Sequence, residues 1–400
     1  MNINFWEPQR EYVKHQSEIL GAVNSCLSRG EIVLGYLEEI KTFEKDFAKF
    51  IGTDFGVMCG SGTQALHLAY RALGLKGNWN HLWQRLKKGE ITLEQADALF
   101  EGDEVITTSH TFIATIDQIV AVGARPILVD IGEDGLIDPK KIQSAITPKT
   151  KAIVPVHLEG KIAQMDEITE IADEYELKII EDAAQAIGAE YYSSSHQYPT
   201  KAGSMGEAGC FSLYPAKIFG SIGNAGFLAT DDPVVAEKAS LLRCNYNIGR
   251  KSKDVAGAEY GHNFEPDAIQ AAVLNVKLPH LEARIKRRSE IAEQYDEAFK
   301  EYPIILPFKQ KGRVYQDYVL RTNKPEQREE IVVYLRANGI GVIGDALIPN
   351  HFYQKLFLTS KLPNTERYLA TQFRIPCNPD LTFEEIEYII KTIQNYYDTK

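Results

Sequence analysis

Three residues lie in surroundings that can support chemistry on a carbonyl compound. Lys217 lies between an aromatic-rich, strand-like run and a glycine-rich turn, where burial would lower the pKa of an amine and make it a nucleophile. Asp182 ends an apolar run, and a buried carboxylate needs a cation or a strong hydrogen-bond donor. Gly62-Thr63 follows a short apolar run and begins a helix, whose free backbone N–H groups attract an anion such as phosphate.

Each of these features also has an ordinary structural explanation. Lys217 could be a surface lysine, Asp182 could cap the helix that follows it, and the turn at residues 60–63 could be purely structural. The combination is more informative, because an amine, a partner for a ring nitrogen and a phosphate cradle are the three fixed parts of a pyridoxal phosphate site. We therefore predict pyridoxal 5′-phosphate as the cofactor.

The surrounding chain alternates between predicted strands and helices. Apolar runs predict strands at 55–59, 105–107, 126–129, 152–156, 177–180 and 227–229. Near-continuous apolar strands between helices indicate an α/β fold with a mostly parallel sheet that is covered on both faces. Ligands bind beyond the carboxyl ends of such strands. The residues that follow the predicted strands include Ser61, Ser109, His157, Asp182 and Lys217.

Two segments depart from this alternation. Residues 77–101 contain two short helical patterns, the second with a capping box, and predict a surface insertion that could act as a lid or a partner contact. From about Pro266 the elements expected are a long linking helix at 267–299, a strand at 315–321, a helix at 325–338, a strand at 341–344 and a helix at 382–397. We expect a large domain over residues 1–265 and a smaller α/β domain over 266–400.

The composition narrows the class of protein. A formal net charge of -11, with no block of lysine and arginine, argues against nucleic-acid binding. The N-terminus lacks a signal-peptide pattern and no apolar run is long enough to span a membrane, so the cytoplasm is the expected compartment. The five cysteines are scattered and lack CxxC spacing, which predicts buried thiols and neither a disulfide framework nor a metal site.

The sequence also resembles the DegT/DnrJ/StrS family of pyridoxal-phosphate-dependent sugar aminotransferases, from about Leu34 to the C-terminus. The motifs that carry the resemblance are Ser61-Gly-Thr-Gln-Ala-Leu, Gly102-Asp-Glu-Val-Ile, Ser109-His-Thr-Phe-Ile-Ala-Thr, Gly123-Ala-Arg-Pro-Ile-Leu-Val-Asp, Pro155-Val-His-Leu, Met165-Asp, Glu181-Asp-Ala-Ala-Gln-Ala, Phe211-Ser-Leu-Tyr-Pro-Ala-Lys, Gly261-His-Asn and Gln270-Ala-Ala. The resemblance implies the aspartate aminotransferase fold (type I), with a seven-stranded, mostly parallel sheet between helices and a smaller C-terminal α/β domain.

The resemblance further implies a role for each residue that matches the family's cofactor site. Lys217 would form the internal aldimine and shuttle the proton, and Asp182 would pair with the pyridine nitrogen. Gln185 would lie near the ring hydroxyl, and Phe112 would stack on the ring. The phosphate would be held by Gly62, Thr63 and Ser212.

The resemblance also implies a homodimer with shared active sites, because Asn263 would reach the cofactor phosphate of the neighbouring subunit. The candidate substrate residues are His110, His157, Glu159, Tyr214 and Tyr315. For His157 the alternative is a hydrogen-bonded core histidine.

The implied reaction is transfer of an amino group from L-glutamate to a nucleotide-linked keto-sugar, which yields an amino sugar for polysaccharide or O-antigen biosynthesis. The sequence departs from the family pattern at Glu159, Asn224-Ala225 and Glu265 and in the insertion at 77–101. Glu159, Lys161 and these unusual loops leave open a small non-nucleotide ketone, such as a cyclitol or a phosphorylated triose. Two further alternatives are a sugar dehydratase, which in this family has histidine in place of the lysine, and a non-catalytic regulator. The presence of Lys217 and Asp182 argues against both.

Overall fold

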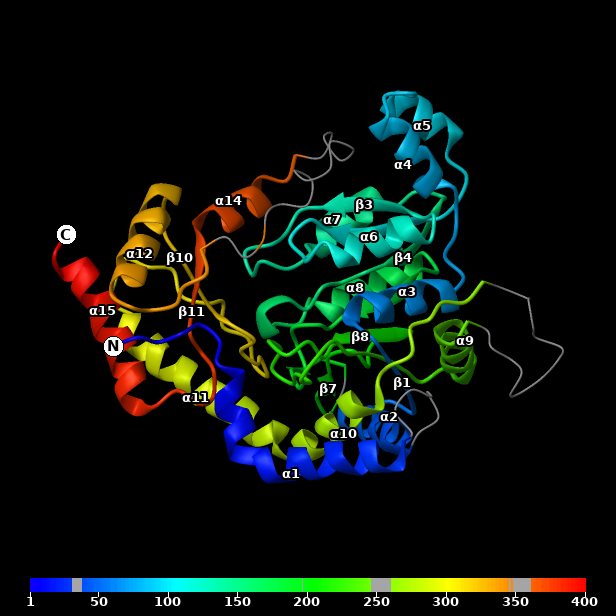
Figure 1. Ribbon diagram of the computed structural model, residues 1–400. Helices are drawn as coiled ribbons and strands as arrows, with labels where there is room; N and C mark the ends of the chain where they lie inside the picture. The colour runs from blue at the N-terminus through cyan, green and yellow to red at the C-terminus, as the bar shows by residue number, and fades with distance from the viewer. Residues whose placement is uncertain (31–37, 196, 246–259, 345–346, 348–360) are drawn as a thin grey trace.

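The computed structural model describes residues 1–30, 38–195, 197–245, 260–344, 347 and 361–400 (Figure 1). Its centre is a seven-stranded sheet with the strand order β1-β9-β8-β5-β4-β2-β3. The strands are β1 (Phe55–Cys59), β2 (Glu104–Thr108), β3 (Arg125–Val129), β4 (Thr150–Ile153), β5 (Lys178–Asp182), β8 (Ala208–Ser212) and β9 (Gly226–Thr230). β9 runs antiparallel to both of its neighbours, and the other adjacent pairs are parallel. The predicted α/β fold with a mostly parallel sheet is therefore confirmed.

Helices cover both faces of this sheet. Successive residues of a strand point to opposite sides, so a strand with apolar residues at adjacent positions must be buried on both faces. In β1 and β5, Val57 and Ile180 pack toward one layer of helices, and Met58 and Ile179 pack toward the other. The first layer consists of α3 (Gly62–Ala72), α6 (Ala114–Ala121) and α9 (Pro233–Arg243). The second layer consists of α2 (Glu38–Ile51), α7 (Pro139–Ala145), α8 (Met165–Glu174) and α10 (Ala268–Lys277). The N-terminal helix α1 (Pro8–Arg29) runs beside α10 (Figure 1).

The C-terminal part has a core of its own. β10 (Tyr318–Arg321) pairs antiparallel with β11 (Gln372–Ile375), and their apolar side chains pack with those of the surrounding helices. These helices are α11 (Leu281–Phe299), α12 (Pro325–Ala337) and α15 (Phe383–Asp398), and α14 (Pro363–Thr371) lies beside α12. Ile3, from the start of the chain, is buried in the same core. The expected domain boundary at residues 265 and 266 stays a prediction.

The segment at 77–101 forms a small unit beside the β3 edge of the sheet (Figure 1). It consists of α4 (Trp79–Lys87) and α5 (Leu93–Leu99). The predicted capping box is present, because the Thr92 side chain accepts from Gln95 N–H and the Gln95 side chain accepts from Thr92 N–H.

The base of this unit depends on glycine. Gly77 and Gly123 both have positive φ, and a Cβ on Gly123 would lie 2.0 Å from the carbonyl oxygen of Gly77. A side chain at either position would force the two backbone segments apart. Above this base, Trp79 and Phe100 meet edge to face in a small apolar cluster.

Two predicted elements are wrong in detail. The long helix expected over 267–299 is interrupted by η3 (Leu278–His280), because Pro279 has no N–H to donate to the preceding turn. Residues 341–344 do not form a strand, and within them Ile343 makes a single bridge to Arg374. The strand that pairs with β10 is instead β11. The remaining short elements are β6 (Glu190–Tyr191), β7 (Thr200–Lys201) and η1 (Leu158–Gly160).

All five cysteines are buried and unpaired, which confirms the predicted buried thiols. Burial raises the pKa of the Cys59 and Cys377 thiols to about 12. Among the described residues, no helix combines the length and the apolar character that crossing a membrane requires.

Candidate active site

A cavity of about 370 Å³ opens at the carboxyl ends of β1, β5 and β8, and the segments after β2 and β4 complete its wall. Its lining includes Gly62, Thr63, Phe112, His157, Asp182, Gln185, Ser212, Tyr214 and Lys217. The structure thus brings together every predicted cofactor residue except Asn263. This is the edge at which α/β sheets bind their ligands.

Lys217 lies in the loop after β8 and is partly buried, because its side chain faces the cavity. Its backbone N–H donates to the carbonyl of Tyr214 at 2.9 Å, which fixes a tight turn. Desolvation lowers the pKa of the Lys217 amine, although the nearby carboxylates of Asp317 and Asp182 act in the opposite direction. The lowered pKa increases the neutral fraction of the amine, and the neutral form attacks carbonyls and accepts protons.

Asp182, the last residue of β5, is only 5% exposed. Its Oδ2 accepts a hydrogen bond from the Thr115 hydroxyl at 2.7 Å, and its Oδ1 accepts one from Ala184 N–H at 3.2 Å. Burial raises the pKa of Asp182, and these two donors oppose the rise. A carboxylate held in this way suits a cationic partner such as a protonated ring nitrogen.

The predicted phosphate cradle lies at the turn between β1 and α3. Ser61 caps α3 by accepting from Gln64 N–H at 3.2 Å. A Cβ on Gly62 would lie 2.8 Å from the Cβ of Ser212, and one on Gly226 would lie 2.1 Å from the Ser61 carbonyl carbon. Glycine at both positions therefore lets the N-terminus of α3 approach Ser212, and together they offer N–H and hydroxyl donors to an anion.

Phe112 and Tyr214 present aromatic rings to the cavity and are 60% and 46% exposed. The other side of the Tyr214 ring lies against Trp6, with ring centroids 6.4 Å apart. Gln185 is oriented because its Oε1 accepts from Glu159 N–H at 3.0 Å. An exposed ring such as that of Phe112 suits stacking on a planar cofactor.

His157 lines the cavity, yet both of its ring nitrogens have protein partners. Its Nδ1 accepts from Ala163 N–H at 3.2 Å, so its Nε2 carries the proton and donates to Glu181 at 2.8 Å. Glu181 also accepts from backbone N–H groups, including that of Gly203 at 2.7 Å. This is the arrangement expected of a hydrogen-bonded core histidine, and a role in binding substrate stays a prediction.

His110 and Glu159 lie outside the cavity wall in a buried polar cluster. Glu159 Oε2 accepts from the Lys161 amine and from the Tyr368 hydroxyl, both at 3.0 Å. His110 Nδ1 donates to the carbonyl of Gly135 at 2.8 Å, and its ring packs against Tyr368. Because Tyr368 belongs to α14, the cluster joins the large sheet to the C-terminal part. The proposed contacts of His110 and Glu159 with substrate stay predictions.

Tyr315 and Asn263 also lie outside the lining of the cavity. Tyr315 stacks with Tyr318 and lies under the guanidinium of Arg313. Asn263 is exposed, and its backbone forms a bridge with Cys244. Whether Asn263 reaches a neighbouring subunit stays a prediction.

Sequence reasoning missed three residues at this site. Thr115 could have been found, because it is the last residue of the Ser109-His-Thr-Phe-Ile-Ala-Thr motif and lies on α6, from which its hydroxyl reaches Asp182. Trp6 and Asp317 are far from Lys217 in sequence, and no local pattern marks either of them. Tertiary packing alone brings them beside Lys217, where both line an adjoining cavity.

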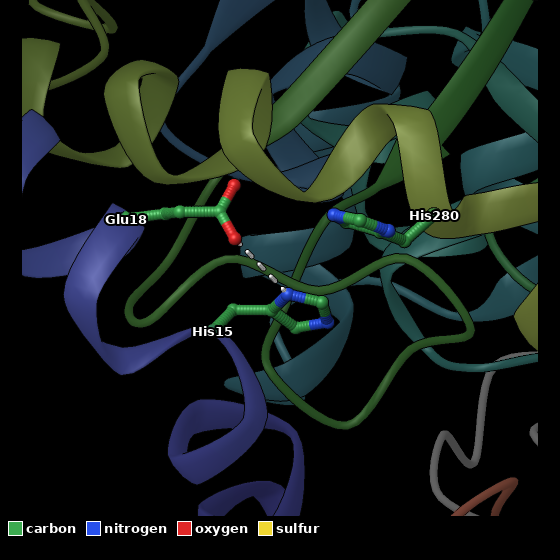
Figure 2. Close-up of side chains that lie close together, drawn as sticks. All are labelled: His15, Glu18 and His280. Carbon is green, nitrogen blue, oxygen red and sulfur yellow. Dashed lines mark ion pairs between the residues drawn. The ribbon is translucent and has the colours of Figure 1, made fainter.

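Within the described part of the chain, one group has the residue types of a metal site: His15, Glu18 and His280 (Figure 2). His15 Nδ1 lies 3.8 Å from Glu18 Oε1, and the two imidazole rings are stacked with centroids 4.2 Å apart. The group lies where α1 passes η3, and none of its members lines the cavity at Lys217. It takes no part in the site described above.

Comparison with known proteins identifies the family. The model of the DegT/DnrJ/EryC1/StrS aminotransferase family matches residues 13–394. The chain belongs to this family. It is 32% identical over 408 residues to the pleiotropic regulatory protein of Geobacillus stearothermophilus, with 99% of both chains covered. It is also 32% identical over 402 residues to dTDP-3-amino-3,4,6-trideoxy-alpha-D-glucose transaminase of Streptomyces venezuelae, covering 98% of this chain and 96% of the relative.

Solved structures agree with this assignment. DesV of S. venezuelae, solved with a ketimine intermediate, has a TM-score of 0.85 at 32% identity, with 99% of both chains covered. NtdA of Bacillus subtilis, solved with bound pyridoxamine phosphate, has a TM-score of 0.83 at 27% identity, covering 99% of this chain and 85% of that one. The fold is that of the type I aminotransferases, and the chain is a pyridoxal-phosphate-dependent aminotransferase.

The residues of the cavity fit this cofactor. The buried carboxylate of Asp182 calls for a cationic partner, and the turn at Gly62 presents donors to an anion. The exposed ring of Phe112 and the desolvated amine of Lys217 face the same space. These four features match the ring nitrogen, the phosphate, the ring face and the aldehyde of pyridoxal phosphate.

Proposed function

We propose that this chain transfers an amino group from L-glutamate to the ketone of a nucleotide-linked sugar. The observation that carries the proposal is that Lys217 and Asp182 face one cavity at the carboxyl edge of the sheet. The S. venezuelae transaminase, which is named for a dTDP-linked amino sugar, supports the choice of a nucleotide-linked substrate. We further propose that the enzyme works in the cytoplasm as a homodimer, in which Asn263 of each subunit contributes to its partner's cofactor site.

Each residue has a defined task in this mechanism. Bound pyridoxal phosphate supplies an electron-withdrawing ring that stabilises negative charge on the carbon next to the transferred nitrogen. Asp182 would hold the ring nitrogen in its protonated form, and Phe112 would lie against the ring. The N–H groups at Gly62 and Thr63, with the Ser212 hydroxyl, would hold the phosphate.

Lys217 would carry the cofactor covalently between turnovers and move the proton during them. Its amine would accept the proton from the α-carbon of the amino donor in the first half-reaction. In the second half-reaction it would deliver a proton to the sugar carbon that receives the nitrogen. The lowered pKa of Lys217 suits both directions, because proton transfer is most efficient when the pKa lies near the working pH.

A regulatory role is the second candidate, because the Geobacillus relative is named as a regulatory protein. The lowered pKa of the Lys217 amine and the hydrogen-bonded Asp182 favour catalysis. An aminotransferase for a small non-nucleotide ketone is a third possibility within the same chemistry. A dehydratase is disfavoured, because Lys217 is present.

The first test measures the absorbance of the purified protein. Protein incubated with pyridoxal phosphate should be yellow, and L-glutamate should shift its absorbance toward that of the pyridoxamine form. Lys217→Ala should lose turnover by at least about 1,000-fold, because both proton transfers depend on this amine. Lys41→Ala, which removes an exposed lysine, serves as the control. A colourless protein would refute the cofactor site, and a yellow protein that reacts with no amino donor would favour the regulatory role.

A further inference from the structure

The group of His15, Glu18 and His280 has no task in the mechanism above, and it lies where two helical segments are both interrupted (Figure 2). Within α1, the backbone leaves the helical region at His15, with φ −115° and ψ 18°. On the opposite segment, η3 interrupts the helix between α10 and α11, and His280 directly follows Pro279 there. The two interruptions meet, and each carries an imidazole that stacks on the other.

The three side chains converge on one space between α1 and η3 (Figure 2). One possible ligand atom from each residue lies within 4.8 Å of the other two. A tetrahedral Zn²⁺ with bonds of about 2.0–2.1 Å needs its ligand atoms about 3.3 Å apart, so the group would have to contract by up to about 1.5 Å. Rotation of the Glu18 side chain, which is 63% exposed, can supply most of this movement.

The Nδ1 atom of His15 points to a ligand, because it is buried and has no hydrogen-bond partner among the described residues. Its distance of 3.8 Å from Glu18 Oε1 is too long for a hydrogen bond. A buried nitrogen without a partner costs free energy, and an ion bound between His15 and Glu18 would remove that cost. His157, by contrast, has a partner at both ring nitrogens, as expected of a histidine with a structural role.

The charges around the group leave the carboxylate of Glu18 for a cation. Three basic residues flank the group in sequence, and each already forms an ion pair with another carboxylate. They are Lys14, Lys277 and Arg284, and their partners are Glu11 and Asp380. Glu18 pairs only with His15 within the part of the chain that the structure describes. A metal ion would therefore meet a carboxylate for which no lysine or arginine competes.

We propose that His15, Glu18 and His280 bind a divalent transition-metal ion such as Zn²⁺, with water completing its coordination. Two imidazoles and one carboxylate form a ligand set that suits Zn²⁺, whereas Mg²⁺ and Ca²⁺ prefer oxygen ligands alone. The ion joins α1 to the break between α10 and α11. Because the segment before α1 places Trp6 against Tyr214, the ion stabilises a part of the chain that borders the active site.

The test is a calorimetric titration of Zn²⁺ into the holoenzyme, after treatment with a chelator and removal of free cofactor. We expect one Zn²⁺ per chain, and no comparable binding of Mg²⁺. His15→Gln and His280→Gln should each weaken binding at least about 100-fold, because the loss of an outer partner of a metal ligand alone costs 10–100-fold. Glu18→Gln changes an exposed side chain, so it keeps the test valid if the histidine variants do not fold, and it should weaken binding at least about 10-fold.

Two histidine variants serve as controls. His81→Gln removes an exposed histidine of α4 and should leave Zn²⁺ binding unchanged. His262→Gln addresses another close pair of imidazoles, because the Nε2 atoms of His67 and His262 lie 3.1 Å apart. It should also leave binding unchanged.

Two further measurements follow the effect of the ion on the fold. At a hundredfold excess over its dissociation constant, Zn²⁺ should raise the melting temperature of the wild type by about 3 °C. It should also slow amide hydrogen exchange in peptides from residues 8–29, because the ion fixes α1 to η3. Neither effect should occur in His280→Gln, and both should persist in His81→Gln.

Three results would overturn the proposed metal site. The first is a wild type that binds no Zn²⁺, and the second is binding whose affinity is the same in the wild type and in the variants of His15, Glu18 and His280. The third is a loss of binding confined to His262→Gln, which would place the ion at His67. Binding at the proposed site without slower exchange in α1 would refute the role of the ion in joining α1 to η3.

Discussion

Burial acts in opposite directions on the two central side chains of the cavity, because desolvation disfavours the charged form of each. It lowers the pKa of Lys217 and raises that of Asp182. The lowered pKa suits the amine, whose neutral form is reactive, but the raised pKa does not suit a carboxylate that must stay ionised. The hydrogen bonds from the Thr115 hydroxyl and from Ala184 N–H oppose the rise in the pKa of Asp182. Thr115 therefore both orients the carboxylate of Asp182 and helps to keep it ionised.

The pKa of Lys217 gives a prediction about stability in the cofactor-free protein. The folded protein binds the Lys217 proton less tightly than the unfolded chain, whose pKa is near 10.5, so stability rises with pH between the folded pKa and 10.5. Lys217→Met removes this titration. It should therefore melt at a higher temperature than wild type at neutral pH, by a margin that shrinks as pH approaches 10.5. Thermal melts across this range, with Lys41→Met as the exposed control, check the sign, and a margin that does not depend on pH would contradict it.

Most of the lining of the cavity at Lys217 could be predicted from the sequence, whereas the residues that the C-terminal part brings beside Lys217 could not. Asp182, Gly62 and Lys217 each follow a strand-like apolar run, and the carboxyl ends of such strands share one edge. Arg374 and Asp317 lie on or beside the small β10–β11 sheet and reach Lys217 only when the C-terminal part docks. No spacing in the sequence encodes that docking.

At the scale of elements, burial on both faces decided which strands could be predicted. β2 and β5 are buried throughout or nearly so, and each has a pair of adjacent apolar residues at or near its centre, Val105-Ile106 and Ile179-Ile180, that marks it in the sequence. β11 was missed, because Gln372 and Arg374 alternate with apolar residues over only four positions. The segment 341–344, Gly-Val-Ile-Gly, also has two adjacent apolar residues, yet it makes only the bridge of Ile343 to Arg374. Whether such a short segment becomes a strand depends on the neighbouring segment with which it pairs in the folded protein, and the local sequence does not show that pairing.

Close packing of β9 against the turn at Ser61 gives a prediction at the element scale. A Cβ on Gly226 would lie 2.1 Å from backbone atoms of Ser61, so Gly226→Ala must push this turn away from Ser212. We expect the affinity for pyridoxal phosphate to fall at least about 10-fold, with a loss of about 1–3 kcal/mol in stability. Absorbance titration with the cofactor measures the first effect.

Gly223→Ala is the matched control, because its Cβ would meet only the flexible end of the Gln270 side chain, at 2.9 Å. Equal cofactor affinities for the two alanine variants would show that the turn tolerates displacement.

At the scale of the whole molecule, the surroundings of Lys217 are complete only when three parts of the chain are assembled, because Trp6, Asp317 and Arg374 reach it from outside the large sheet. The N-terminal segment supplies Trp6, and Arg10 ties it to Glu385 of α15 through two hydrogen bonds of 2.7 and 2.6 Å. The buried cluster of Glu159, Lys161 and Tyr368 joins the large sheet to α14. Correct chemistry at Lys217 thus depends on contacts made far from it.

The proposed homodimer predicts complementation between inactive subunits. Lys217→Ala and Asn263→Ala enzymes should each be impaired, because one lacks the amine and the other lacks the proposed phosphate contact to its partner. After unfolding and refolding together, mixed dimers should contain one site with both native residues and recover up to about a quarter of wild-type activity, by random pairing of symmetric dimers. Activity no higher than the sum of the separate variants would argue against shared sites.

The burial of all five thiols has a practical consequence for labelling. The thiolate is the form that reacts with a maleimide, and a thiol with a pKa of about 12, such as that of Cys59 or Cys377, is almost entirely protonated at neutral pH. A cysteine introduced at the exposed position of Ala98 on α5 would therefore react far ahead of the native ones. The chain can carry a fluorophore on its projecting unit with every natural cysteine left in place.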